Sequence, residues 1–225
     1  MKRITVLLAE DHQVVREGFR ALLEHECDIE VVGEAETGRQ AVELTRKLRP
    51  AVVVMDIAMP VLNGLEATRQ IRKGFPDTRV LILSAHSDNA YVEQVAVLGA
   101  SGFLLKQTSS DNLATAIREV QKGNTFFSSA ISKRLHDCDQ KSLDREGQFK
   151  KKTNRLSSRE VEVLQLITEG KPNKQVAAEL GVSFKTVDKH RQHLMSKLNI
   201  HDVAGLTRYA IAEGIIESNV RVTIS

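Results

Sequence analysis

Residues 51–60 read AVVVMDIAMP, an apolar run that ends abruptly at a carboxylate, Asp56. The pattern recurs along the first half of the chain. ITVLLA at 4–9 precedes Glu10 and Asp11, RVLIL at 79–83 precedes Ser84, and GFLL at 102–105 precedes Lys106. Runs that are apolar at nearly every position are typical of strands buried on both faces of a parallel sheet.

Helical spacing fills the stretches between these runs, as in Val15, Phe19 and Leu22. Alternating strands and helices predict a doubly wound α/β sheet of five parallel strands over about residues 4–123. The expected strands are Ile4–Leu8, Ile29–Gly33, Ala51–Met55, Val80–Leu83 and Gly102–Leu105. Ligands of such sheets bind outside the carboxyl ends of the strands, so the polar residues that end the runs should converge there.

Three acids, a hydroxyl and an ammonium gathered in one crevice suggest metal-assisted phosphoryl chemistry. Mg²⁺ prefers oxygen ligands and keeps several waters, so Asp11 and Asp56 would bind it, with Glu10 reaching it directly or through water. Asp56 would act as the nucleophile and form an aspartyl phosphate. Lys106 and the metal would neutralise the phosphoryl oxygens, and Ser84 would donate a hydrogen bond to one of them.

The chain changes character after about Gly123. Residues 137–155 are polar and highly charged, which is typical of a linker, and SSAISKRL at 128–135 would form a short helix before it. We therefore expect one domain over 1–125, a short helix and linker over 126–155, and a second domain over 156–225.

Four helices are predicted in the second domain. Ser157 and Glu160 form an S-x-x-E capping box at the first. A short second helix follows at Asn173–Leu180 and ends at a turn at Gly181. Ser183 would cap a third helix that runs to about Leu198, and a fourth helix covers Asp202–Glu213. Two helices joined by a short turn that contains glycine are the helix-turn-helix signature, which points to DNA.

Composition limits the class of protein. Apolar content of 41% and charged content of 27% are ordinary for a globular protein, and no apolar stretch approaches the roughly 20 residues that span a bilayer. Cys27 and Cys138 lack metal-ligand spacing, so free thiols and a cytoplasmic location are expected. The formal net charge is +3 in total, with −2 over residues 1–125 (15 basic, 17 acidic) and +4 over 151–225 (12 basic, 8 acidic), a modest asymmetry.

The motifs EDH at 10–12, MDIAMP at 55–60, LSA at 83–85 and GFLLK at 102–106, in this order, resemble the receiver domain of two-component response regulators. The resemblance implies a flavodoxin-like (CheY-like) fold and transfer of a phosphoryl group from a sensor histidine kinase to Asp56. It also implies that the Ala58 carbonyl binds Mg²⁺ and that Phe103, with Ser84, switches position on phosphorylation. Glu10 stands where aspartate is commoner, and Gln107 where many receivers have proline.

The segment from Leu156 to about Glu217 resembles the helix-turn-helix domain of the LuxR/NarL/FixJ regulators. The resemblance implies that Asp188, Lys189 and Gln192 read base edges, that Lys185, Thr186 and His193 contact phosphates, and that the last helix dimerises. In the third helix, Val187, His190, Leu194 and Leu198 form an inward stripe, so His190 is expected in the core. Asp188 has two open interpretations, acceptor for a cytosine amino group or partner of Lys185 or Arg191.

The favoured function is therefore a transcription factor controlled by phosphorylation, with a kinase and promoter DNA as partners, RNA polymerase as a further partner, and a homodimer when phosphorylated. We do not expect this protein to be an enzyme. A phosphatase of the haloacid-dehalogenase type would have a second acid two residues after the nucleophile, where this chain has Ala58. Two further functions remain open: a constitutive DNA binder with a vestigial receiver, and a four-helix domain that binds protein in place of DNA.

Overall fold

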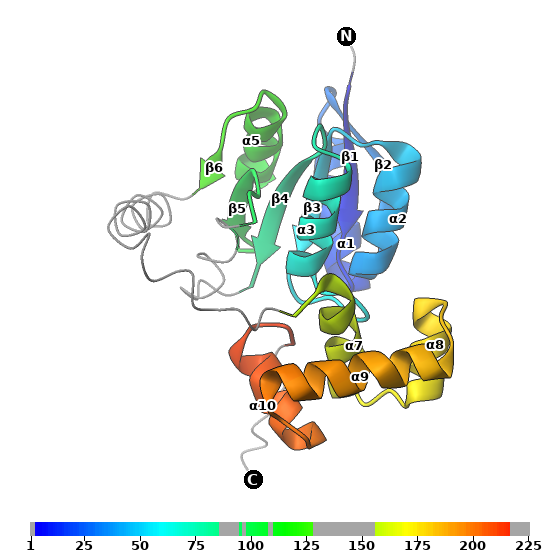
Figure 1. The fold of residues 1–225 in the computed structure, drawn as a ribbon. Helices are drawn as coiled ribbons and strands as arrows, with labels where there is room; N and C mark the ends of the chain where they lie inside the picture. Colours follow the sequence, from blue (N-terminus) through cyan, green and yellow to red (C-terminus); the bar gives the residue numbers. More distant parts are fainter. Residues whose placement is uncertain (1–2, 86–94, 96–97, 108–109, 128–155, 217–225) are drawn as a thin grey trace. The chain divides into compact units, whose positions relative to one another are not determined.

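The computed structural model describes residues 3–85, 95, 98–107, 110–127 and 156–216, and the chain divides into two compact units, Met1–Lys151 and Lys152–Ser225 (Figure 1). The short helix expected at 128–135 and the linker at 137–155 lie outside the described residues. Within those residues, no helix is long and apolar enough to cross a membrane.

The first unit is built on a parallel sheet with the order β2-β1-β3-β4-β5-β6. Its strands are β1 (Ile4–Ala9), β2 (Ile29–Ala35), β3 (Val52–Asp56), β4 (Arg79–Ser84), β5 (Gly102–Leu105) and β6 (Phe126–Phe127). The five expected strands are confirmed. The sequence missed β6, an edge strand that pairs with β5, because two residues are too few to carry a periodic signal.

Helices cover both faces of this sheet, as a doubly wound fold requires (Figure 1). Helices α1 (Gln13–Glu24) and α5 (Ser110–Gln121) contact one another, and α2 (Gly38–Leu48) contacts α3 (Gly64–Gly74). Alternate strand residues enter two separate cores: Leu7 and Val53 enter one, and Leu8 and Val54 enter the other. This double burial explains why the strands are apolar at nearly every position.

The second unit contains α7 (Ser158–Thr168), α8 (Asn173–Leu180), α9 (Phe184–Leu198) and α10 (Val203–Ala212). The capping box is confirmed: the Ser157 side chain accepts from the backbone of Glu160, and the Glu160 carboxylate accepts from the backbone of Ser157. Ser183 and Asp202 cap α9 and α10, and Gly181 ends α8 in the left-handed region at φ 61°. The boundaries of α8, α9 and α10 agree with those expected from the sequence to within one or two residues.

The four helices of the second unit share one apolar core. Val163, Leu166, Val187, Leu194 and Leu206 are all fully buried. An ion pair adds to this packing, because Lys197 Nζ on α9 lies 2.6 Å from Glu160 Oε2 at the start of α7. The second half of α9 is thereby fixed to the first helix, and its other faces remain at the surface.

The turn between β3 and α3 brings the backbone of Gly64 against that of Asp56. The Gly64 N–H donates to the Ile57 carbonyl at 2.9 Å, and a Cβ at position 64 would lie 1.8 Å from the Asp56 carbonyl oxygen. No side chain fits there without moving the strand end. Glycine is therefore required by the close approach of two backbone segments.

We expect Gly64→Ala to lower the free energy of unfolding of the first unit by about 1–3 kcal/mol, as overpacking does. Gly18→Ala is the matched control, since a Cβ there meets nothing within 4 Å in the middle of α1 and should add about 0.5–1 kcal/mol. Urea unfolding followed by circular dichroism measures both. An unchanged midpoint for Gly64→Ala would contradict the close approach.

Candidate functional site

The carboxyl ends of β1, β3 and β5 bring three charged side chains together. Lys106 Nζ lies 2.7 Å from Glu10 Oε2 and 3.0 Å from Asp56 Oδ2. Glu10 and Asp56 are buried, at 2% and 3% exposure. The Lys106 N–H donates to the Ser84 carbonyl at 2.8 Å, which joins the ends of β4 and β5 beside the acids. The order of the strands in the sheet therefore brings together residues that are almost a hundred positions apart in the chain.

Asp56 is held against ionisation by its surroundings. Its pKa is raised from 3.8 to about 6, chiefly by burial and then by the charge of Glu10, while Lys106 offsets part of the effect. The Lys106 pKa is also raised: burial acts to lower it, but the two carboxylates outweigh burial. In the absence of a metal ion, one ammonium is thus shared by two buried acids that repel each other.

Several oxygen atoms at this point lack a hydrogen-bond donor. Glu10 Oε2, Asp11 Oδ1 and Asp56 Oδ2 are buried, and the contacts that they make are ion pairs: Lys106 Nζ lies near the first and the third, and His12 Nδ1 lies near the second. Among the described residues, the Ala58 carbonyl also accepts no hydrogen bond. Unsatisfied carboxylate and carbonyl oxygens are the donor set that a hard divalent cation prefers, so these residues fit Mg²⁺.

The remaining predicted residues of the crevice differ in exposure. Ser84 is 4% exposed at the end of β4, and Phe103 on β5 is fully buried in the core, so its switching role remains a prediction. The His12 side chain is 69% exposed, and its Nδ1 lies 2.9 Å from Asp11 Oδ1 and 3.2 Å from Glu10 Oε1.

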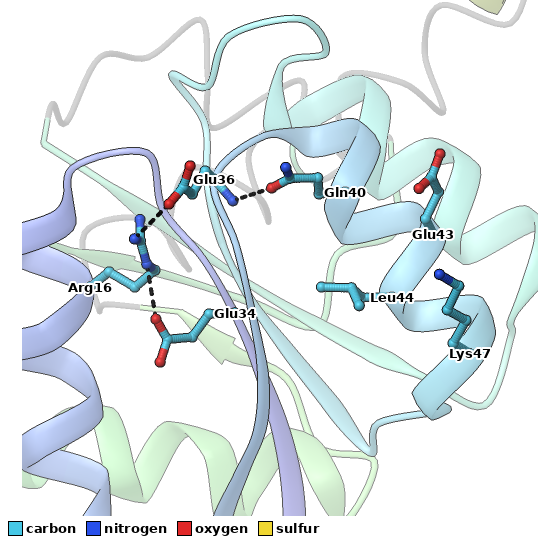
Figure 2. Close-up of a pocket in the computed structure, with 7 residues that line it drawn as sticks. All are labelled: Arg16, Glu34, Glu36, Gln40, Glu43, Leu44 and Lys47. Carbon is cyan, nitrogen blue, oxygen red and sulfur yellow. Dashed lines mark hydrogen bonds and ion pairs between the residues drawn. The ribbon is translucent and has the colours of Figure 1, made fainter. Parts of the chain in front are cut away.

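Sequence reasoning missed Arg16, which is 6% exposed on α1. Its guanidinium donates to the Glu10 carbonyl at 2.7 Å, to Glu34 at 3.0 Å and to Glu36 at 3.0 Å. Figure 2 shows the ion pairs of Arg16 with Glu34 and Glu36 at a hollow of about 410 Å³, whose other lining residues are Gln40, Glu43, Leu44 and Lys47 of α2. The residues that line this hollow do not include Glu10, Asp11 or Asp56. No sequence signal predicts Arg16, because its partners are distant in the chain.

The second candidate site is the exposed surface of α9. Lys185, Lys189, Gln192 and His193 are exposed, whereas Thr186 and Asp188 are half-buried. Val187 and Leu194 are fully buried, but His190 is only half-buried, so it lines the edge of the core. The face predicted to meet DNA is thus accessible in the second unit.

Asp188 has a different partner from the two expected from the sequence. It accepts a hydrogen bond from Gln192 Nε2 at 3.1 Å, one turn along α9. Arg191 instead donates to Asn173 Oδ1 on α8 at 3.0 Å. The helix therefore joins two of its expected base-reading residues to each other.

The raised pKa of Asp56 predicts a pH-dependent stability in the absence of divalent metal. The folded state holds the proton up to about pH 6 and the unfolded state only to about 3.8, so stability falls as the pH rises through this window. Above it, Asp56→Asn should be more stable than the parent chain by about 1–3 kcal/mol, at 1.36 kcal/mol per pKa unit.

The measurement is urea unfolding in EDTA at pH 4 and pH 7.5. We expect the advantage of Asp56→Asn at pH 7.5 to shrink toward zero at pH 4. A constant difference between the two pH values would show that Asp56 carries no charge penalty. Asp77→Asn is the control for the same acid-to-amide change at an exposed position of this unit.

Comparison with known proteins gives a match for each of the two units. Residues 6–118 match the response regulator receiver domain, and residues 154–210 match the bacterial regulatory proteins of the luxR family. The transcriptional regulatory protein DegU of Brevibacillus brevis is 38% identical over 211 residues, covering 89% of each chain. The oxygen regulatory protein NreC of Staphylococcus carnosus is 37% identical, covering 94% of this chain and 99% of its own.

Solved structures agree with the fold. RcsB of Salmonella typhimurium superposes with a TM-score of 0.59 at 28% identity, covering 95% of this chain and 99% of its own. The signal receiver domain of NarL from Mycobacterium tuberculosis gives a TM-score of 0.54 at 35% identity, covering 55% of this chain and 100% of that domain. A third similar structure is RcsB in complex with DNA, with a TM-score of 0.57 at 28% identity, covering 94% of this chain and 99% of its own. The chain therefore belongs to the two-component response regulators, with a receiver domain followed by a LuxR-type DNA-binding domain, a family of transcriptional regulators and not of enzymes.

Proposed function

We propose that phosphorylation of Asp56 by a sensor histidine kinase controls how tightly the second domain binds promoter DNA. The observation that carries the proposal is the arrangement of Lys106 between the buried carboxylates of Glu10 and Asp56. Attack by Asp56 on the phosphoryl donor breaks the bond to the donor and forms an acyl phosphate. Lys106 neutralises the oxygens of the transferring group, and Ser84 donates to one of them once the group is in place.

A divalent cation is part of this proposal. Glu10, Asp11, Asp56 and the Ala58 carbonyl would hold Mg²⁺, which supplies positive charge to the transferring phosphoryl group. The support is the set of buried oxygens that lack a hydrogen-bond donor. Glu10 in place of the commoner aspartate keeps the same charge, and its carboxylate reaches the site, since it meets Lys106 at 2.7 Å.

The output would pass from the receiver to DNA through a change in assembly. The receiver was expected over 1–125, but strand β6 extends its sheet to Phe127 because Phe126 and Phe127 pair with β5. We propose that a short helix and linker, expected up to 155, join it to the DNA-binding domain (156–225), and that Ser84 and Phe103 report phosphorylation to the receiver surface. Phosphorylation would favour a homodimer that binds paired half-sites in the cytoplasm, with RNA polymerase as a further partner. Exposed Val203 and Ile211 on α10 offer apolar surface for the dimer.

Within α9, we propose that Asp188, Lys189 and Gln192 read base edges and that Lys185, Thr186 and His193 contact phosphates. The exposure of Lys185, Lys189, Gln192 and His193 supports this assignment. Recognition helices enter the major groove and contact bases through their early residues.

The test is DNA affinity and oligomeric state at fixed salt, with and without acetyl phosphate and Mg²⁺. We expect tighter DNA binding together with dimerisation for the parent chain only, and neither for Asp56→Asn, because the amide cannot accept the phosphoryl group. Asp77→Asn is the matched control and should respond as the parent does. Equal DNA binding in all samples would make the chain a constitutive DNA binder.

A second prediction concerns the acid on α9. Asp188→Ala removes the acceptor that holds the Gln192 amide, and it removes an acceptor for cytosine N4. We expect a change in affinity that depends on sequence, worth about 1–3 kcal/mol at the affected base pair. The measurement is competition between a panel of single-base operator variants. Uniformly stronger binding to every duplex would show that Asp188 only repels phosphates.

A further inference from the structure

Phe184, the first residue of α9, is 57% exposed. It is the only aromatic residue among the exposed large hydrophobic side chains of the described part of the chain. Phenylalanine is usually buried, because its large apolar ring is unfavourable in contact with water. An exposed ring of this kind is suited to a binding partner that covers it.

The ring lies in line with residues already assigned to base recognition. Phe184, Asp188 and Gln192 are four residues apart in turn, so they follow one stripe along α9. Lys185 and Lys189 are exposed beside this stripe, and their positive charges are suited to the phosphates on either side of a groove. The surroundings of Phe184 therefore complement DNA better than an apolar protein partner.

The backbone that carries Phe184 is held in place. The Ser183 side chain accepts from the Thr186 N–H at 3.1 Å, and the two hydroxyl oxygens lie 2.9 Å apart. Val187, three residues on, is fully buried in the core. Phe184 is thus presented from a capped and anchored first turn, so little backbone freedom would be lost on binding.

We propose that Phe184 contacts the C5-methyl group of a thymine in the major groove and so specifies that base. This inference rests on the proposed DNA binding through α9. The methyl group is the apolar feature of the major groove, and phenylalanine is among the side chains that contact it. The other three bases lack this group at the groove edge, so the contact distinguishes thymine from them.

Uracil tests this contact, because it pairs as thymine does and lacks only the methyl group. Duplexes are first selected from a random pool by the full chain treated with acetyl phosphate and Mg²⁺. Each thymine is then replaced singly by deoxyuridine, and affinity is measured for the parent chain, Phe184→Ala and Phe184→Leu. Val14→Ala, at 82% exposure in the receiver, is the control for removing an exposed apolar side chain.

We expect one thymine per half-site at which uracil weakens the parent chain about fourfold, the value of one buried methyl group. Phe184→Ala should bind the thymine duplex more weakly and show no penalty for uracil at that position. Phe184→Leu should keep part of the penalty, and Val14→Ala should behave as the parent. The salt dependence of binding should be the same for all variants, since Phe184 makes no phosphate contact.

Two failures are distinguishable. If the parent chain binds selected and scrambled duplexes equally, the proposed sequence-specific DNA binding fails. If it prefers the selected duplexes but no uracil affects it, or if Phe184→Ala keeps the full uracil penalty, the thymine contact is wrong and the proposed function stands.

Discussion

The sharing of one ammonium by two buried carboxylates is the interaction on which the receiver depends. Glu10, Asp11 and Asp56 carry three negative charges and Lys106 one positive charge, so the set has a net charge of about −2 when all are ionised. Burial makes this imbalance costly, as the raised pKa of Asp56 indicates. A divalent cation would cancel the charge. The same deficit that destabilises the metal-free site is therefore what makes it a binding site for metal and phosphoryl groups.

Such a cluster persists only because the surrounding sheet fixes its positions. The strands that end at the site are buried on both faces, and alternate residues enter two separate cores. Arg16 donates to the Glu10 carbonyl, and the backbone of Gly64 packs directly against that of Asp56. Apolar packing along the strands thus offsets unfavourable electrostatics at their ends, which is a common arrangement at functional sites.

The sequence predicted most of this arrangement, for a physical reason. In a parallel sheet the strand ends meet at one edge, so a residue type that follows each apolar run locates the crevice without any distance information. The hydrogen-bond and ion-pair partners of individual side chains were not predictable in this way. The Arg16 network with Glu34 and Glu36 and the pair of Asp188 with Gln192 depend on which of several partners each side chain adopts. The edge strand β6 was missed because its two residues pair only through the tertiary fold.

The hydrogen bond between Asp188 and Gln192 gives the acid on this helix a role other than repelling phosphates. A glutamine amide has two donor hydrogens and one acceptor oxygen, and Asp188 uses one of these hydrogens. The second hydrogen and the oxygen remain available, which is the pair of groups that a bidentate contact with adenine requires. An acid at this position would then fix the orientation of the amide before binding. Gln192 would then lose less rotamer freedom when it binds DNA. This smaller entropy cost would offset the repulsion between Asp188 and the phosphates.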